Sequence, residues 1–379
     1  MFAKRKTITD LKQDLMTRYR IHPDTQKVLS DFAVPKQLGF GEVKVPLMYR
    51  ADYLDGEWVS AELQPYGPIE LDPAAKVLHY AQEVFEGMKA YRVDGAKSET
   101  PHFFRPLENL ARMNRSADRM CMISVPESIF MDGIGSITAH AEPFIPRNSG
   151  ESLYLRPFLI GTRPNLGMGI SNSFIFIVIA SPSAIYHSGN MRVQIERSGC
   201  RAARGGTGAA KTGGNYAAAL QSAKQVQQRG YDQSLWLDPI NMENIEELSG
   251  MNFFVELDGA LHTPMLNGSF LAGVTRDSIV QLARHKGMEV VERDLPISEI
   301  LEAIESGRAT EAFACGTAAI VAPISLIADA DGKEYVLPSV DVVAATLRTE
   351  LLAVQEGRSD DPFGWVTPLD AGYYPSIPN

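Results

Sequence analysis

RAARGGTGAAKTGGNY (residues 201–216) surrounds a single lysine, Lys211, with glycines and alanines. Residues this small allow the backbone to approach a bulky group closely, or allow Lys211 to point into a cleft. A flexible surface loop with a solvated lysine would have the same composition. The stretch is therefore the first candidate for a functional site, with a plain loop as the alternative.

Two chemistries compete for this lysine. GGTGAAKT nearly matches the phosphate-binding pattern G-x-x-x-x-G-K-[ST], but Ala210 stands where the second glycine belongs. Gly213 and Gly214 follow the lysine, where that pattern needs a helix to begin around the phosphates. A lysine that forms a Schiff base instead needs neighbouring positive charge, and Arg201 and Arg204 are near Lys211 in the sequence. From these residues alone, both chemistries stay open.

The flanking segments alternate between strand and helix patterns. Strand-like or hairpin segments are predicted at 46–72 around Asp55-Gly56, 152–161, 173–180, 191–197, 234–239, 251–264 and 311–315, and helices at 106–120, 126–140, 216–228 and 276–285. This mixture indicates an α/β protein of the α+β type. We expect a small N-terminal domain at 1–185, an interdomain linker at 186–200 and a larger C-terminal domain at 201–379.

Composition excludes several classes of protein. The chain has 379 residues and a net charge of −10, whereas a nucleic-acid binder normally has a basic surface. Its longest apolar run, Phe174–Ala180, is far shorter than the roughly 20 residues that a membrane span needs. Three cysteines at distant positions argue against a disulfide framework and give no support to a metal site. We expect a soluble, cytoplasmic protein without bound metal.

Family-like motifs occur in order along most of the chain. They are HYAQEVFEGMKAYR (79–92), SLYLRPFLIGTRPNLG (152–167), GGTGAAKTGGNY (205–216), IEELSGMN (245–252), LAGVTRDS (271–278) and ACGTAA (314–319). Together they resemble branched-chain amino acid aminotransferases, which are pyridoxal-phosphate enzymes of fold type IV. The resemblance implies a two-domain fold, with a small N-terminal α/β domain and a larger C-terminal domain built on a pseudo-barrel sheet. It also implies pyridoxal 5′-phosphate as cofactor.

The resemblance assigns cofactor roles to particular residues. Lys211 would form the Schiff base with the cofactor and then serve as general base for proton transfer. Glu247 would face the pyridine nitrogen, while its neighbour Glu246 is expected to face solvent. Tyr216 would hydrogen-bond the cofactor 3′-oxygen. The phosphate would be held by Arg112, Val274, Thr275 and Thr317, and Arg201 would lie in the outer sphere around the cofactor.

Substrate-binding residues follow from the same resemblance. Arg156 would reach the side-chain carboxylate of glutamate as a charge-assisted pair. The amides of Thr317 and Ala318, together with Tyr154, would hold the α-carboxylate. The aromatic wall would consist of Tyr80, Phe85, Tyr154 and Tyr186. Because Tyr80 and its neighbours complete the pocket of the partner subunit in the family, a homodimer is implied.

The expected reaction is reversible transfer of an amino group from L-leucine, L-isoleucine or L-valine to 2-oxoglutarate, giving the branched 2-oxo acid and L-glutamate. The first alternative is another enzyme of fold type IV, a D-amino acid aminotransferase or an aminodeoxychorismate lyase. YLRP around Arg156 and the wall of Phe85 and Tyr80 favour the branched-chain enzyme. A more remote alternative is a P-loop nucleotide-binding protein, against which Ala210 already counts.

Overall fold

The computed structural model describes residues 19–185, 189–338 and 342–375. Contacts group the chain into two units, residues 1–184 with 355–379 and residues 185–354. The sequence places a first domain at 1–185, a linker at 186–200 and a second domain at 201–379. The two units have different bounds from these at two places. Residues 191–196 form a strand inside the sheet of the second unit and are therefore not a linker. Residues 355–379 group with the first unit, because the strand at 366–368 pairs with its sheet.

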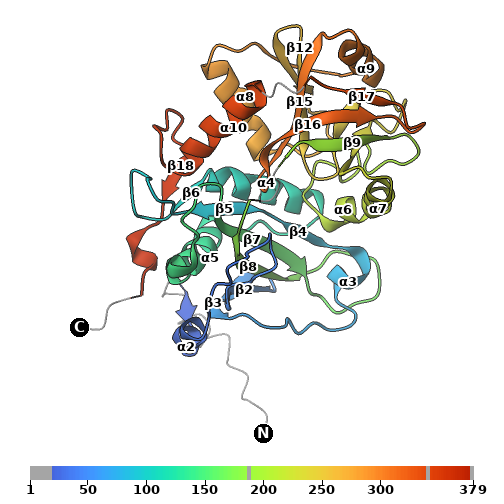
Figure 1. Cartoon of the computed structure of the whole chain (residues 1–379). Helices are drawn as coiled ribbons and strands as arrows, with labels where there is room; N and C mark the ends of the chain where they lie inside the picture. The colour runs from blue at the N-terminus through green and yellow to red at the C-terminus, as the bar shows by residue number, and fades with distance from the viewer. Residues whose placement is uncertain (1–18, 186–188, 339–341, 376–379) are drawn as a thin grey trace. The chain divides into compact units, whose positions relative to one another are not determined.

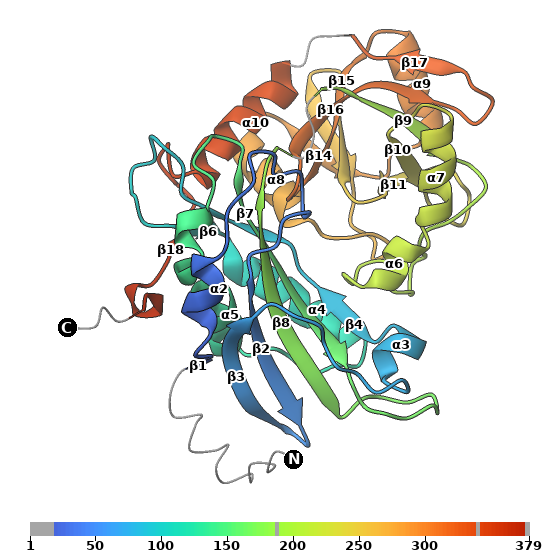
Figure 2. The ribbon, with the colours of Figure 1, turned by 60° about the horizontal axis from the view of Figure 1, so that its bottom comes forward.

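A mixed sheet with helices packed against it forms the first unit (Figures 1 and 2). Its strand order is β1-β3-β2-β8-β7-β5-β6-β18, and β4 pairs with β7. The strands are β1 (Arg20–Ile21), β2 (Leu47–Leu54), β3 (Glu57–Pro65), β4 (Glu83–Phe85), β5 (Met88–Tyr91), β6 (His102–Phe104), β7 (Ser152–Gly161), β8 (Ser173–Ser183) and β18 (Val366–Pro368). The helices are α2 (Thr25–Ser30), α3 (Lys76–Tyr80), α4 (Pro106–Arg119) and α5 (Glu127–His140), with short 3-10 turns at Glu142–Phe144 and Ala371–Tyr373.

The predicted hairpin at Asp55-Gly56 is confirmed, since β2 and β3 pair antiparallel around it (Figure 2). Both turn residues have positive φ, which the Asp-Gly pair tolerates. The helices predicted at 106–120 and 126–140 are confirmed as α4 and α5. Helix α5 packs across β2, β7 and β8 and buries Phe130, Ile134 and Ile137. This packing fixes the positions of the residues carried by β4, β7 and α4.

Six strands close into a ring in the second unit, in the order β11-β10-β9-β16-β15-β12 with β12 pairing back to β11. The unit contains β9 (Met191–Glu196), α6 (Gly213–Ala217), α7 (Leu220–Gln228), β10 (Gln233–Leu237), β11 (Ile245–Leu248), β12 (Asn252–Leu257), β13 (Ala260–Pro264), α8 (Val274–His285), β14 (Val290–Arg293), α9 (Ile297–Glu305), β15 (Ala309–Gly316), β16 (Ile320–Ala328), β17 (Glu334–Val336) and α10 (Val342–Gln355). The predicted pseudo-barrel sheet of a fold-type-IV protein is thereby confirmed.

The helix predicted at 216–228 is wrong in its detail, because the structure has two helices there. Helix α6 ends at Ala217 and α7 begins at Leu220. The Ala219 N–H donates to the Tyr216 carbonyl, three residues back instead of four, which tightens the chain into a turn. Helix α6 also begins at Gly213, so the two glycines after Lys211 start a helix and do not interrupt one.

None of the helices in the described ranges combines the length and the apolar character that a membrane crossing requires.

Candidate active site

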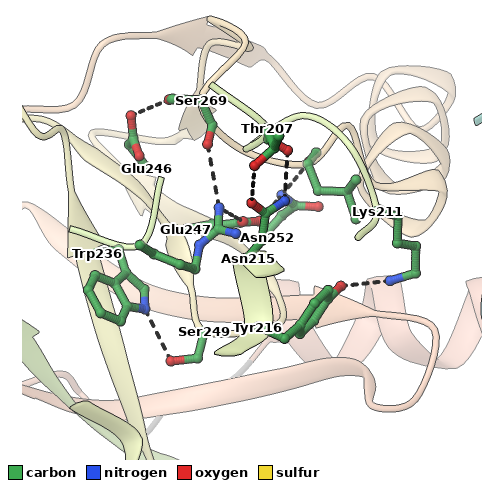
Figure 3. Close-up of polar contacts among 12 residues, drawn as sticks. Thr207, Lys211, Asn215, Tyr216, Trp236, Glu246, Glu247, Ser249, Asn252 and Ser269 are labelled. Carbon is green, nitrogen blue, oxygen red and sulfur yellow. Dashed lines mark hydrogen bonds and ion pairs between the residues drawn. The ribbon is translucent and has the colours of Figure 1, made fainter. Parts of the chain in front are cut away.

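Lys211 lies in the lysine loop, which we define as residues 197–212 between β9 and α6. Its Nζ is 2.8 Å from the hydroxyl oxygen of Tyr216, and the two side chains point toward each other (Figure 3). Tyr216 is carried by the first helical turn after the loop, so a spacing of five residues is enough to bring the two groups together. The structure thus places Tyr216 beside Lys211, while its predicted hydrogen bond to the cofactor 3′-oxygen stays a prediction.

Asn215 orders the backbone immediately before the lysine. Its side-chain amide donates to the carbonyls of Thr207 and Ala210, each at 2.7 Å, and its carbonyl oxygen accepts from the Thr207 hydroxyl at 2.8 Å. Asn215 is only 4% exposed, so these bonds are made away from water, where polar groups need partners. The side chain of Asn215 therefore ties together both ends of the turn that leads to Lys211 (Figure 3).

Glu247 on β11 is a buried carboxylate paired with Arg201 from the lysine loop, at 2.5 Å between Oε1 and Nη2. Burial raises the pKa of Glu247 to about 7, because desolvation disfavours the charged form. The charge of Arg201 opposes this shift, as do the backbone N–H of Leu271 and, to a smaller extent, the charge of Lys211. Near neutral pH, Glu247 can therefore either hold a proton or carry a charge.

The buried side chain of Asn252 connects Glu247 to the segment before α8. Its amide nitrogen is 3.2 Å from Glu247 Oε2 and 2.9 Å from the Leu271 carbonyl. A Cβ on Gly273 would lie 2.1 Å from Asn252 Oδ1, so only glycine fits at this helix N-cap. Val274 and Thr275 then form the first helical residues, where backbone N–H groups lack intrahelical acceptors and the helix dipole favours an anion.

Thr317 and Ala318 lie in the turn between β15 and β16, and both are partly exposed. Since β15 is hydrogen-bonded to β12, the turn belongs to the same ring that carries Glu247 and Asn252. The structure thus places Lys211, Tyr216, Arg201, Glu247, Val274, Thr275, Thr317 and Ala318 in the second unit.

Arg112 lies in the first unit, within helix α4, where Glu86 holds its side chain. Arg112 Nε is 2.7 Å from Glu86 Oε1 and Nη2 is 2.8 Å from Oε2, which makes a bidentate pair. The Asn109 amide and the Gly87 N–H also donate to Glu86 Oε2, at 2.8 and 3.2 Å. Glu86, the residue after Phe85, thereby sets the orientation of the Arg112 side chain.

Three predicted substrate residues come together in the first unit. The guanidinium of Arg156 lies 4.9 Å from the ring centroid of Phe85 and 5.4 Å from that of Tyr154, within the range of cation–π contacts. Its Nη2 also donates to the Tyr154 hydroxyl at 3.0 Å. Tyr80, on α3, donates its hydroxyl to the Leu166 carbonyl. Tyr186 lies outside the described residues.

A family model described as amino-transferase class IV matches residues 83–327. The chain belongs to the class IV aminotransferase family. It is 43% identical over 343 residues to the branched-chain-amino-acid aminotransferase of Mycolicibacterium smegmatis, covering 88% of this chain and 92% of that protein. It is 38% identical over 363 residues to branched-chain-amino-acid aminotransferase 2 of Bacillus subtilis, covering 94% and 99%.

Solved structures agree with this family. A branched-chain amino acid aminotransferase from T.th., complexed with N-(5′-phosphopyridoxyl)-L-glutamate, has a TM-score of 0.68 at 27% identity, over 84% of this chain and 98% of that one. The Escherichia coli branched-chain amino acid aminotransferase has a TM-score of 0.66 at 26% identity, over 85% and 99%.

For this class IV aminotransferase, one sequence expectation about a neighbour of the site is wrong. Glu246 does not face solvent, because it is 4% exposed and accepts a hydrogen bond from the hydroxyl of Ser269 (Figure 3). The whole of β11 is buried, so both faces of the strand are covered and adjacent residues are buried alike. The sequence signal that could have predicted this burial is the position of Glu246 and Glu247 between the apolar residues Ile245 and Leu248.

Sequence reasoning also missed the residues that orient this aminotransferase site. Asn215, Asn252 and Glu86 each lie inside a family-like motif, but their partners are distant in sequence or are backbone atoms. Among the described residues, no group of three or more His, Cys, Asp or Glu side chains could hold a metal ion.

Proposed function

We propose that this chain transfers the amino group of L-leucine, L-isoleucine or L-valine to 2-oxoglutarate, using pyridoxal 5′-phosphate bound at Lys211. The observation that carries the proposal is the placement of Lys211 against the Tyr216 hydroxyl, in the same unit as the buried carboxylate of Glu247 and its partner Arg201. The resemblance to branched-chain-amino-acid aminotransferases along nearly the whole chain supports the substrate class.

The residues of the second unit fit the proposed cofactor. Lys211 offers an amine for the cofactor aldehyde, and Tyr216 offers a hydroxyl beside that amine. Glu247 offers a buried carboxylate for the ring nitrogen, since a carboxylate there keeps that nitrogen protonated. The first turn of α8, at Val274 and Thr275, offers backbone N–H groups to a phosphate. Arg201 Nε is buried without a hydrogen-bond partner in the described part of the chain, which suits a site that receives an anionic group.

When bound, the cofactor supplies an electron sink that stabilises negative charge at the substrate Cα. Lys211 would take the proton from the substrate Cα as general base and deliver it as general acid to the C4′ carbon of the cofactor, which is the shift that turns an amino acid into a keto acid. The Tyr216 hydroxyl holds Lys211 Nζ in place for this transfer. The carboxylate of Glu247, paired with Arg201, would keep the proton on the ring nitrogen.

In the first unit, the cluster of Arg156, Phe85 and Tyr154 supports a substrate role. Phe85 and Tyr154 supply apolar surface for a branched side chain, and Arg156 supplies a cation for the second carboxylate of 2-oxoglutarate. Arg156 Nε is buried and unpartnered among the described residues, so a bound anion would satisfy it. Arg112 would hold the cofactor phosphate, and the Thr317 and Ala318 amides the substrate α-carboxylate.

A homodimer is proposed from the exposed apolar side chains of α3 and of the loop after β7. Leu166 is 70% and Met168 is 91% exposed, while Lys76 Nζ donates to the Asn165 carbonyl at 2.7 Å and ties the loop to α3. Patches of this kind usually mark contact surfaces. Replacing Met168→Glu should convert the dimer to a monomer in light-scattering measurements, whereas a wild-type monomer would contradict the proposal.

The cytoplasm is the proposed location. Cys121, Cys200 and Cys315 are free thiols, and the first two are exposed, as is usual in a reducing compartment.

The deciding experiment combines spectroscopy with a specific assay. Purified protein with pyridoxal phosphate should absorb in the visible range, and borohydride reduction should fix the cofactor to the peptide that contains Lys211. L-leucine and then 2-oxoglutarate should change and restore the spectrum. Lys211→Ala should lose turnover and keep the fold, since Lys211 is a partly exposed loop residue. Turnover of D-alanine but not L-leucine would overturn the substrate assignment.

A further inference from the structure

Glu246 is a buried titratable group that the proposed reaction does not use. It precedes Glu247 on β11, and successive side chains of a strand point to opposite faces. Glu246 therefore lies on the opposite face of β11 from Glu247 and meets Ser269 there. A buried carboxyl group needs strong compensation from its neighbours, so its contacts indicate what it holds in place.

Glu246 holds a tight turn at residues 267–269. The Ser269 hydroxyl contacts both Glu246 Oε1 and, at 2.5 Å, Asn267 Oδ1. The Ser269 N–H also donates to Asn267 Oδ1 at 2.9 Å, and Gly268 between them has a φ of +90°. A hydroxyl has one proton for two acceptors, so one of its contacts requires a donor from the other side. Burial raises the pKa of Glu246, while hydrogen bonds from Ser269 and Asn267 and the charge of Arg201 oppose this rise, so Glu246 is held by the turn and by the lysine loop together.

The carbonyl of Ser269 supports the lysine loop at two points. Arg201 Nη2 donates to this oxygen at 3.5 Å, while the same guanidinium pairs with Glu247. A Cβ placed on Gly208 would lie 1.8 Å from the same oxygen, so the loop backbone rests directly on it. Ser269 itself is fully buried, and the turn cannot yield toward solvent.

The contact at Gly208 is transmitted to Lys211 through Asn215. Gly208 lies between Thr207 and Ala210, the two residues whose carbonyls Asn215 binds. A shift of Gly208 away from Ser269 would therefore strain the Asn215 bonds and displace the residue that follows Ala210, which is Lys211.

We propose that Glu246 and Ser269 are positioning residues. Glu246 holds Ser269, and the carbonyl of Ser269 contacts the lysine loop and fixes the placement of Lys211 and Arg201. This inference rests on the proposed function for its catalytic consequence and on the contacts alone for its effect on the loop. The hydrogen bond between Glu246 and Ser269 carries the effect. A neutral side chain of the same shape should therefore replace Glu246, whereas an apolar one should not.

The test compares Glu246→Leu, Ser269→Ala and Glu246→Gln with the control Glu243→Leu, an exposed glutamate on the same segment. In the apoprotein, hydrogen exchange of residues 201–212 should be faster in Glu246→Leu and Ser269→Ala, with exchange in β12 and β15 unchanged. With cofactor, both variants should show kcat lowered by about 10- to 100-fold, as expected for a misplaced catalytic group, and KM for L-leucine within about twofold. Glu246→Gln should restore both measurements.

The double variant Glu246→Leu/Ser269→Ala should be no worse than either single one, since both remove the same contact. Normal loop exchange in Glu246→Leu would overturn the inference, and so would faster exchange throughout the unit or failure of Glu246→Gln to rescue. If the wild-type protein does not transaminate L-leucine, the proposed function fails. The exchange measurements on the apoprotein would still decide the role of Glu246 and Ser269.

Discussion

Two buried pairs of glutamate and arginine, one in each unit, have different surroundings. Glu86 and Arg112 form a bidentate pair, and Glu86 accepts two further hydrogen bonds, from Asn109 and from the Gly87 N–H. Glu247 meets Arg201 through one oxygen, supported by Asn252 and the Leu271 N–H, and its pKa is raised to about 7. The side chains are comparably buried: Glu86 is 0% and Arg112 6% exposed, and Glu247 is 6% and Arg201 7% exposed.

The number and geometry of donors separate the two pairs. The donors around Glu86 fix its orientation and that of Arg112, because each hydrogen bond adds a geometric constraint to the pair. A carboxylate with fewer donors at similar burial keeps a proton affinity near neutral pH. The first arrangement suits a structural support for Arg112, and the second suits a group that exchanges a proton with a ligand.

The largest effect is expected for Glu86→Ala. Removing this carboxylate takes the negative charge away from the buried Arg112 guanidinium, which typically costs about 3–5 kcal/mol of the free energy of unfolding. Urea unfolding of the apoprotein should show an early transition. The exposed Glu70→Ala control should change the free energy by less than about 0.5 kcal/mol. If Glu86→Ala and Glu70→Ala unfolded at the same urea concentration, Glu86 would not be the structural support for Arg112 that this comparison assumes.

Glu247→Gln should change how stability depends on pH. Since the pKa is raised from 4.5 to about 7 on folding, the unfolded chain releases this proton first as pH rises, and stability falls between those values. The wild-type apoprotein should lose up to about 3 kcal/mol over this interval through Glu247, and the glutamine variant should not. Unfolding free energies at pH 5 and pH 8 measure the difference, and parallel pH profiles would refute the assignment.

Asn252→Ala should have an intermediate effect. It removes the side-chain donor that Glu247 Oε2 and the Leu271 carbonyl share, at a cost of about 1–3 kcal/mol. Because the lost hydrogen bond favoured the charged carboxylate, the pKa of Glu247 should rise further. The fall in apoprotein stability should therefore extend to higher pH than in the wild type, and a shift to lower pH would contradict this account.

The smallest effect is expected for Asn109→Ala, the counterpart in the first unit. Glu86 keeps both contacts to Arg112 and the Gly87 N–H, so the loss should be about 1 kcal/mol. The pH dependence of unfolding should stay as in the wild type. If Asn109→Ala moved that dependence as much as Asn252→Ala, the number of donors would not be what separates the pairs.

Local patterns predicted much of this molecule. The turn at Asp55-Gly56 and the helical spacing of Pro106–Met120 depend on neighbours in sequence, and both were found. The contact between Lys211 and Tyr216 is equally local, because five residues and one helical turn bring the two side chains together. The division of residues 213–228 into two helices was not predicted, since alanines favour a helix wherever the tertiary structure permits one.

Contacts distant in sequence could not be read in advance. Arg112 and Glu86 are 26 residues apart and Glu246 and Ser269 are 23 apart, and nothing in either segment specifies the other. Glu246 was assigned to solvent because a glutamate alone is usually exposed. Its burial depends on β11 being one strand of the closed ring, and the closure of that ring involves strands from the whole second unit.

The division of the first unit between two stretches of chain has a consequence for biosynthesis. Residues 355–379 supply β18 to the sheet of that unit, and the buried carboxylate of Glu356 accepts hydrogen bonds from Ser149 and Gly150. During translation these residues leave the ribosome only after the entire second unit, residues 185–354, has emerged. The unit whose first residues are made earliest is therefore the one completed last, and the nascent chain must hold β6 as an unpaired edge until then.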